Sequence, residues 1–400
     1  MADKKISELT ELTTPDGTEE LVFNDSGVSK KVQIDNLLAG GTISNFTSTG
    51  IDDNATSTAI TIDASENVSL VGTLTGTVLN DSDGNVRSGR KNLIINGGFD
   101  VWQRGTSGFG HNVYSADRWR EDFNTGNGVA ISKHNISSGG ETGLPLGFTS
   151  AFKYALTVGS GSGSGLHDVR QKIELPKRFE GQTFTLSYYV KASSSCTVSN
   201  RRIYLVNVTN PFSGASLPSL SVTTTWQKVT DTFTFGTSST AVYSSSSFLD
   251  LVLSAPVATS VDIDYYITGV QLELGSVATD FEHRSYGEEL ALCQRYYQSF
   301  GGGHLYETVC IGITRTTADV RYQLLFSIDM RVPPTLVIVG PWRSLGTNVV
   351  AVVNADMTIN TSSTRGVDLY LVTTGHVAGE SYQLTAANDS TARLQFSAEL

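Results

Sequence analysis

Apolar side chains recur at every second position over long parts of this chain, which is the period of a β-strand and not of a helix. The alternation is clearest where Ile60 and Ile62, and then Val68 and Leu70, stand between polar residues. Short apolar segments bounded by Gly, Ser, Asn and Pro continue through the rest of the sequence. Because such segments form strands joined by tight turns, the sequence predicts a mainly β protein.

The composition supports this prediction and excludes one class of partner. Charged residues make up 17 % of the 400 residues, below the ~25 % of an ordinary soluble domain. Ser, Thr, Asn and Gly take their place, which favours strands and turns over helices. Acidic residues outnumber basic ones by 39 to 28, so the net charge is −11. Since a basic face is needed to neutralise phosphates, we expect no nucleic-acid partner.

Signals for membranes, export, metals and cofactors are missing from the sequence. No apolar run reaches the ~18 residues of a membrane span, so we expect no membrane insertion. The first residues, MADKKISE, lack the apolar core of an export signal. Cys196, Cys293 and Cys310 are odd in number and share no ligand spacing, which predicts free thiols. The Gly/Ser run 159–165 does not fit a dinucleotide fingerprint, and no metal or cofactor is predicted.

Residues 1–40 have the pattern of a small segment that cannot fold alone. A short helical pattern over 6–12 precedes two predicted strands, 21–23 and 32–34, on either side of the turn 24–27. The apolar mass is too small for an independent core. We therefore expect a partner to cover this segment.

Residues 41–90 carry the two-residue alternation but almost no aromatic residue and no second apolar layer. A lone pair of strands is marginally stable in water. We interpret the segment as a short β shaft in which three chains each contribute one narrow apolar ridge, so that a homotrimer supplies the core that one chain lacks. A flexible linker is the alternative.

Residues 91–285 contain many short strand patterns and most of the aromatic residues, which predicts a β-sandwich of the jelly-roll type. In its last strand the apolar positions change parity at Gly269, which predicts a β-bulge. Helical spacing predicts a helix over 288–299. Residues 286–400 are therefore expected to form this linking helix and a smaller C-terminal β-sandwich.

Few residues have the pattern of a catalytic or metal site. Asp100 and Asp117 lie near aromatic residues, and a carboxylate pair beside aromatic walls would suit glycoside hydrolysis. A turn or an ion pair is the preferred interpretation of Asp117. Asp262 and Asp264 alternate with apolar residues, which predicts a solvated strand face, with calcium binding as the alternative.

Exposed aromatic rings are the usual platforms for sugars, because a ring face stacks on the apolar C–H face of a sugar. Tyr306, Trp342 and Tyr243 stand in loop-like contexts, and Arg343 is adjacent to Trp342. These four residues are the candidate carbohydrate-binding residues, although a packing role is the preferred interpretation of each. The other three tryptophans are predicted to be core residues: Trp102, Trp119 and Trp226.

Three stretches of the sequence resemble a domain that is common in bacteriophage tail-fibre and receptor-binding proteins. Residues 91–106, KNLIINGGFDVWQRGT, and 114–119, YSADRW, resemble its opening. Residues 269–284 resemble its closing strand, and 289–298, ELALCQRYYQ, resemble the helix that commonly follows it. The order and spacing of these stretches match the domain over 91–300.

Weaker similarities extend over the rest of the chain. Residues 3–38 are similar to segments by which phage fibres attach to the tail, and residues 50–63 are similar to repeats of fibre shafts. Residues 330–335 and 396–400 resemble parts of C-terminal tip domains.

The resemblance implies a homotrimeric protein of the virion tail. Residues 1–40 would bind tail adaptor or nozzle proteins, and the outer β domains would bind host surface polysaccharide or lipopolysaccharide. The chain lacks the long β-helix block of depolymerase spikes and an obvious self-cleaving chaperone domain, so we expect no enzyme activity. A short tailspike glycan hydrolase and a purely structural tail adaptor are the alternatives.

Overall fold

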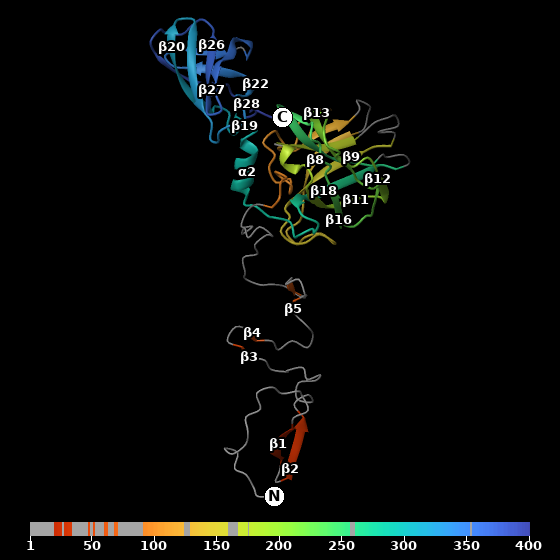
Figure 1. The fold of residues 1–400 in the computed structure, drawn as a ribbon. Coiled ribbons are helices and arrows are strands. Elements are labelled where there is room, and N and C mark those ends of the chain that lie inside the picture. Colours follow the sequence, from red (N-terminus) through yellow and green to blue (C-terminus); the bar gives the residue numbers. More distant parts are fainter. Residues whose placement is uncertain are drawn as a thin grey trace, which may run out of the picture. The chain divides into compact units, whose positions relative to one another are not determined.

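The computed structural model describes residues 91–400 except 124–128, 159–166, 175, 257–260 and 353, and the backbone of six short strands before residue 91. The chain divides into two compact units, Met1–Ser88 and Gly89–Leu400. Strands dominate the described residues of both units (Figure 1), and α2 is the one α-helix among them. The predicted mainly β fold is confirmed.

In the first unit, β1 (Glu20–Asp25) and β2 (Val28–Gln33) form an antiparallel hairpin. This pairing confirms the strand predicted over 21–23 and residues 32 and 33 of the strand predicted over 32–34, of which residue 34 lies outside the described residues. Two smaller hairpins follow along the chain: β3 (Thr47–Ser48) with β4 (Ile51–Asp52), and β5 (Ile60–Ile62) with β6 (Val68–Leu70). The helical pattern over 6–12 and the alternation beyond residue 70 lie outside the described residues, and the trimeric shaft stays a prediction.

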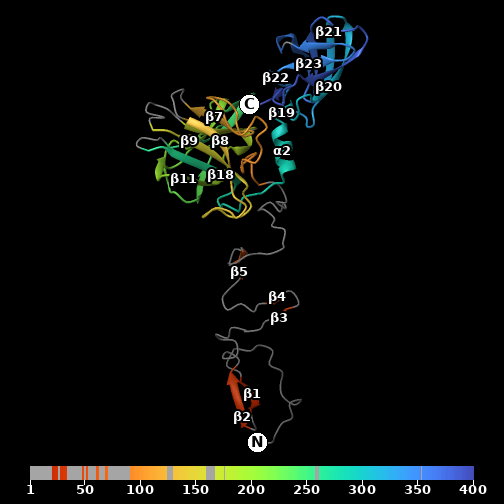
Figure 2. The same cartoon turned by 180° about the vertical axis from the view of Figure 1, so that it is seen from behind.

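Most of residues 91–285 form a β-sandwich (Figures 1 and 2). One five-stranded antiparallel sheet has the order β14-β13-β17-β10-β7, and the other has the order β16-β11-β18-β9-β8. The strand bounds are β7 (Arg120–Phe123), β8 (Val129–Asn135), β9 (Ser150–Leu156), β10 (His167–Ile173), β11 (Thr183–Ala192), β13 (Arg202–Thr209), β14 (Ala215–Ser216), β16 (Gln227–Thr234), β17 (Val242–Ser254) and β18 (Ile263–Leu274). A small pair, β12 (Cys196–Val198) and β15 (Leu220–Val222), lies outside these sheets.

One hydrophobic core holds the two sheets together. Val169 and Leu251 come from the first sheet, Leu186 and Leu272 come from the second, and all four are buried in the same cluster. Alternate residues of a strand point to the same side of its sheet. The apolar residues at every second position therefore form the inner face of the sandwich.

The bulge that the sequence predicts at Gly269 is present in β18. Ser187 of β11 pairs with Gln271, whereas Tyr189 pairs with Thr268. The register therefore shifts at Gly269, which lies between these two pairs. Gly269 has φ +64°, and a Cβ at this position would lie 2.8 Å from the Phe148 ring. Both the backbone angle and the close approach require glycine. After the bulge, Val270 and Leu272 are buried as the parity change predicts.

The helix α2 spans Tyr286–Gln294, so the prediction of a helix over 288–299 is wrong at both ends. Ser285 caps it: the Ser285 hydroxyl accepts a hydrogen bond from the Glu288 backbone N–H, and the Glu288 carboxylate accepts one from the Ser285 N–H. The helix stops early because Tyr297 and the residues after it form a strand that pairs with β28. Sheet hydrogen bonds override the helical spacing of the sequence here.

Residues 297–397 form two further antiparallel sheets around a separate hydrophobic cluster. Seven strands have the order β24-β23-β27-β20-β21-β26-β25, and three have the order β19-β28-β22. The strand bounds are β19 (Tyr297–Gly301), β20 (Thr308–Thr316), β21 (Asp319–Leu325), β22 (Thr335–Val339), β23 (Trp342–Leu345), β24 (Val349–Val352), β25 (Met357–Ser362), β26 (Gly366–Val372), β27 (Ser381–Ala386) and β28 (Arg393–Ser397). The domain boundaries at residues 40, 90 and 285 stay predictions.

Candidate functional site

The stretches that carry the sequence resemblance meet in a buried cluster that we call the junction: Asn96, Arg104, Asp117, Arg118 and Glu399. The Asn96 side-chain amide donates hydrogen bonds to the carbonyl oxygens of Val101 at 2.9 Å and of Asp117 at 3.0 Å. The Trp119 indole N–H donates to the Asn96 carbonyl at 2.8 Å. These bonds fix the two opening stretches, 91–106 and 114–119, against each other.

Two arginines of the junction hold residues near the far end of the chain. Arg118 is 1 % exposed and forms an ion pair with Glu399. Arg104 forms two ion pairs, one with Glu399 at 3.1 Å and one with Asp117 at 3.3 Å. The Arg118 guanidinium also lies 3.5 Å from the centre of the Tyr296 ring. Buried charges need partners of this kind, so the junction has a structural role.

The carboxyl group of Asp117 is occupied within the junction. It accepts hydrogen bonds from Gln103 and Arg104. Burial raises the pKa of Asp117 to about 6, because the charged form is separated from water, although Arg104 and Gln103 act in the opposite direction. Asp100 accepts a hydrogen bond from the Thr149 hydroxyl at 2.6 Å. The two candidate hydrolase carboxylates are therefore both engaged in structural contacts.

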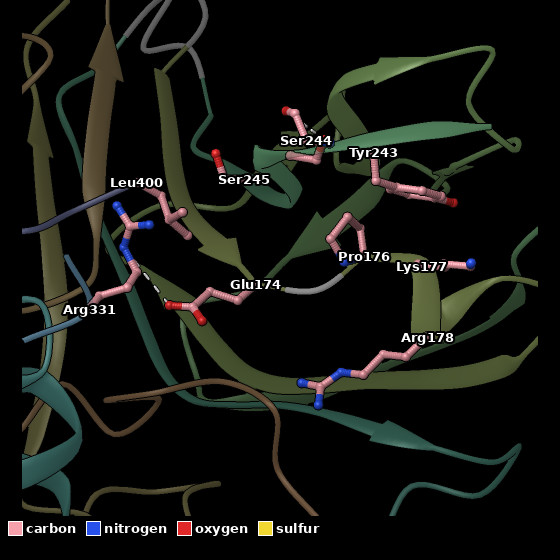
Figure 3. A pocket seen from close by; sticks show the side chains of 10 residues that line it. Glu174, Pro176, Lys177, Arg178, Tyr243, Ser244, Ser245, Arg331 and Leu400 are labelled. Atoms are coloured by element: carbon pink, nitrogen blue, oxygen red, sulfur yellow. Dashed lines mark hydrogen bonds and ion pairs between the residues drawn. The ribbon is translucent and has the colours of Figure 1, made fainter.

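A cavity of about 710 Å³, which we call the Tyr243 cavity, lies between the end of β10, the first half of β17 and the segment that joins β21 to β22 (Figure 3). Such a volume accommodates a small ligand. Its lining residues are Glu174, Pro176, Lys177, Arg178, Tyr243, Ser244, Ser245, Ser247, Arg331 and Leu400.

The serine wall of the cavity is produced by a bulge in β17. Val206 of β13 lies opposite Phe248, and Val208 lies opposite Tyr243, so residues 244–247 loop out against the single residue Asn207. Asn207 has φ +56°. Its carbonyl accepts a hydrogen bond from the Ser247 hydroxyl at 2.5 Å, and its side-chain amide donates to the Ser246 carbonyl at 3.1 Å. The bulge leaves Ser244 and Ser245 exposed at the cavity.

The acidic group of the cavity is neutralised by neighbours. The Glu174 carboxylate accepts a hydrogen bond from the Tyr296 hydroxyl at 2.7 Å and lies 3.2 Å from Arg295. Arg331 lies 3.9 Å away on the other side, as the dashed line in Figure 3 marks. Arg331 also donates to the Ala398 carbonyl at 2.8 Å. Glu174 and Arg331 therefore hold the wall of the cavity together.

The basic group of the cavity comes from a short 3-10 helix, η2 (Pro176–Phe179). Pro176 and Phe179 are buried at its two ends, whereas Lys177 and Arg178 between them are exposed. Neither cation belongs to an ion pair among the described residues. Figure 3 shows the side chains of Arg178 and Lys177 extended in different directions along the edge of the cavity.

Of the four predicted carbohydrate-binding residues, Tyr243 lies at the cavity. Its ring is half-buried and packs against the core of the sandwich. Its hydroxyl oxygen is buried and makes no hydrogen bond within the described residues. The ring, and not the hydroxyl, is thus the part of Tyr243 that lines the cavity.

The structure places Trp342 and Arg343 in β23 and Tyr306 in the turn between β19 and β20. The expectation of an exposed Trp342 ring is wrong, because Trp342 is 1 % exposed and its indole N–H donates to the Val339 carbonyl at 3.1 Å. Its position in β23, between β24 and β27, turns the ring into the core. Tyr306 is 51 % exposed. The Arg343 guanidinium lies 4.7 Å from the centre of the Tyr306 ring, so these two residues form a surface pair.

Several other sequence predictions find their place in the structure. Cys293 and Cys310 are buried free thiols, and Cys196 is a half-buried one. Asp264 pairs with Lys153 at 2.8 Å, and Asp262 accepts a hydrogen bond from the Val158 N–H at 2.8 Å. Trp119 and Trp226 are buried, as predicted, and Trp102 packs at the edge of the same core.

Two absences concern only the part of the chain that the structure describes. No three side chains of the metal-binding types His, Cys, Asp and Glu gather there as a ligand group. No helix of that part has the length and apolar character to span a membrane.

The sequence search missed Glu174, Arg178 and Arg331. They come from three separate segments that only the tertiary fold brings together, so no local spacing marks them. Two local signals were available: the adjacent cations 177–178 in a chain poor in charge, and the serine run 244–247 directly after Tyr243.

Comparison with known proteins gives no family for this chain. No protein-family profile matches it, and no curated protein sequence matches it.

Several solved structures match parts of the chain at low similarity. The first is the enzymatically active domain of tailspike protein 4 from bacteriophage CBA120. The alignment covers 46 % of this chain and 21 % of that chain at 12 % identity, with a TM-score of 0.29. The CBM22-1 xylan-binding domain from Paenibacillus barcinonensis is 12 % identical over 48 % of this chain and 100 % of that chain, with a TM-score of 0.26. A cyclase from Fischerella sp. is 15 % identical over 48 % and 98 %, with a TM-score of 0.31. Likeness at this level, to proteins this different, assigns no function to the chain.

Proposed function

We propose that this chain is a non-enzymatic bacteriophage tail-fibre protein whose outer β domains bind a glycan on the host surface. The observation that carries the proposal is the Tyr243 cavity, where an aromatic ring, exposed serine hydroxyls and charged side chains line one space of about 710 Å³. An apolar ring beside a few well-placed polar groups is the general composition of a small-ligand site. It suits a sugar, which has apolar C–H faces and hydroxyl edges.

The phage assignment is supported by the sequence. The resembling stretches over 91–300 lie in the order expected for the fibre domain, and the structure joins two of them through Asn96 and Trp119. In this proposal, residues 1–40 bind tail adaptor or nozzle proteins, and the protein is part of the virion tail.

We further propose that the protein acts as a homotrimer. Ile311 and Ile313 of β20 and Leu325 of β21 are 61 %, 60 % and 77 % exposed on neighbouring strands. Exposed apolar residues of this kind mark interaction surfaces. We expect further copies of the same chain to cover them, because the shaft pattern over 41–90 predicts a homotrimer. Three weak glycan sites on one fibre would bind more tightly than one.

The absence of catalysis is part of the proposal. The Asp117 carboxylate, which a hydrolase would need free, accepts hydrogen bonds from Gln103 and Arg104 in the junction. The hydrolase alternative and the adaptor alternative are distinguished from glycan binding by the following experiment.

The test measures binding of the full chain to a panel of purified bacterial capsular polysaccharides and lipopolysaccharides. Tyr243→Ala removes the ring, and Ser245→Trp fills the cavity without removing core contacts. We expect both variants to bind at least tenfold more weakly than the unchanged protein. The matched control, Tyr306→Ala, removes an exposed tyrosine outside the cavity and should bind as the unchanged protein does.

Each other result contradicts a part of the proposal. Loss of binding in Tyr306→Ala with full binding in Ser245→Trp would move the site to the C-terminal sheets. New reducing ends after incubation would make the protein a hydrolase. Failure to bind any member of the panel would favour a structural adaptor.

A further inference from the structure

The charges around the Tyr243 cavity do not cancel. The Glu174 carboxylate is matched by Arg295 at 3.2 Å and by Arg331 at 3.9 Å. The two cations of η2, Lys177 and Arg178, belong to no ion pair among the described residues. Two uncompensated cations thus lie beside the cavity on a chain whose net charge is −11.

We propose that the Tyr243 cavity binds an acidic saccharide and that Arg178 holds its carboxylate or phosphate group. This inference rests on the proposed glycan-binding function and names the class of glycan. Lys177 contributes positive potential at the rim, and the ring of Tyr243 packs against the apolar face of a sugar.

The chemistry of arginine suits this role. A guanidinium group is planar and can donate two parallel hydrogen bonds to a carboxylate or a phosphate, and it keeps its charge at every physiological pH. Arg178 lines the cavity, and Figure 3 shows its side chain extended along the edge of the cavity, clear of Glu174 and Pro176. Because Glu174 is bonded to Tyr296 and Arg295, it does not occupy Arg178.

The backbone that carries Arg178 is well anchored. Pro176 and Phe179, on either side of the two cations, are buried. Phe179 belongs to the core of the sandwich and packs against the rings of Phe184 and Phe235. An anchored backbone lowers the entropy lost when a ligand binds, because only side-chain freedom remains to be removed.

The same arrangement lets an acidic protein bind a polyanion. Charges on exposed surfaces are screened beyond about 8 Å at physiological ionic strength, so the net charge of −11 does not prevent a local contact. At the cavity, Lys177 and Arg178 add positive charge to a lining whose one acidic side chain, Glu174, is already paired. The Ser244 hydroxyl is bonded to Ser246 and Ser247 within the bulge, whereas the exposed hydroxyl of Ser245 can bond to the neutral hydroxyls of the sugar.

The test is an array that presents acidic saccharides beside matched neutral counterparts. Each uronic-acid saccharide is paired with its carboxyl-reduced form, and each phosphorylated saccharide with its dephosphorylated form. The full chain is compared with Arg178→Gln, with Arg178→Lys, and with Arg365→Gln. Arg365 is the control, since its side chain is 81 % exposed and it lies outside the cavity.

We expect the unchanged protein to bind at least one acidic saccharide at least tenfold more tightly than its neutral counterpart. Arg178→Gln should lose this preference, Arg178→Lys should retain part of it, and Arg365→Gln should retain all of it. Preference for a carboxylate or for a phosphate identifies which anion the cavity takes.

The other outcomes separate this inference from the proposed function. Equal binding of acidic and neutral members would overturn the inference and leave glycan binding intact. An acidic preference that survives in Arg178→Gln would overturn the role of Arg178. If no saccharide binds, glycan binding itself fails, and the inference fails with it.

Discussion

The junction and the Tyr243 cavity are both rich in arginine, but they use arginine in opposite ways. In the junction, Arg118 is buried, pairs with Glu399 and stacks on Tyr296. At the cavity, Arg178 is exposed and belongs to no ion pair among the described residues. The first arrangement holds parts of the chain together, and the second leaves a charge available for a ligand.

The residues that carry the sequence resemblance and the residues of the proposed binding site are therefore different. Asn96, Arg104 and Arg118 of the junction all come from the stretches that resemble the phage fibre domain. Tyr243 and Arg178 of the cavity lie outside those stretches. The shared pattern therefore describes how the sandwich is joined to the segment that follows it, whereas the residues of the proposed binding site lie outside the pattern.

Breaking the junction should have the largest effect. Arg118→Ala removes the more deeply buried of the two arginines that pair with Glu399, and loss of one member of a buried ion pair costs up to about 3–5 kcal/mol. We expect a clearly lower midpoint of urea unfolding. The corresponding change at the cavity, Arg178→Ala, is the comparison, and an Arg118→Ala midpoint equal to that of Arg178→Ala would contradict the division of roles.

The pH dependence of stability should also come from the junction. Burial raises the pKa of Asp117 from its ordinary value of 3.8 to about 6. Because the folded state holds this proton more tightly, the contribution of Asp117 to stability is complete below pH 4 and is lost as the pH rises to 6. At about 1.4 kcal/mol per pKa unit, the loss is about 2–3 kcal/mol.

The measurement compares unfolding midpoints of the unchanged protein and Asp117→Asn between pH 4 and pH 7. Asparagine stays neutral, so the difference between the two proteins should change with pH in favour of the variant as the pH rises. Parallel curves over this range would show that Asp117 does not titrate in the folded protein as described.

Glu174 lies between the two regions and sharpens the comparison. Glu174→Gln weakens the contacts to Arg295 and Arg331 and should cost about 1 kcal/mol of stability. The same change removes a negative charge from the cavity wall, so binding of an acidic saccharide should become tighter. Weaker binding of the acidic saccharide, measured by calorimetry, would contradict the charge balance described for the cavity.

Arg178→Gln should have the smallest effect on stability. An exposed side chain without an ion pair contributes within about 0.5 kcal/mol, so thermal unfolding of this variant should match that of the unchanged protein. A large loss of stability would mean that Arg178 has a structural role like that of Arg118.

Much of the fold follows from local pattern. The alternation of apolar residues predicted most strands, and the parity change at Gly269 located the bulge, because both depend on neighbours in the sequence. The end of α2 at Gln294 and the burial of Trp342 could not be predicted from local pattern. Tyr297 joins β28, and Trp342 joins β27, through pairings with distant strands that have no local signal.

The site was less accessible to prediction than the fold. Tyr243 was identified as an aromatic residue in a loop-like context, and the serine run 244–247 that follows it was the one local signal that separates it from Tyr306. Arg178 and Glu174 lie far from Tyr243 in the sequence and reach it only because β10 and β17 are neighbours in one sheet. Residues that line a cavity between distant segments form no periodic pattern in the sequence.

The most direct test of glycan binding at the Tyr243 cavity is an experimental structure of the full chain with a bound host oligosaccharide. We predict sugar density between Tyr243, the serine bulge and η2, with an acidic group beside Arg178. Sugar density beside Tyr306 and Arg343, with the Tyr243 cavity empty, would contradict the central claim.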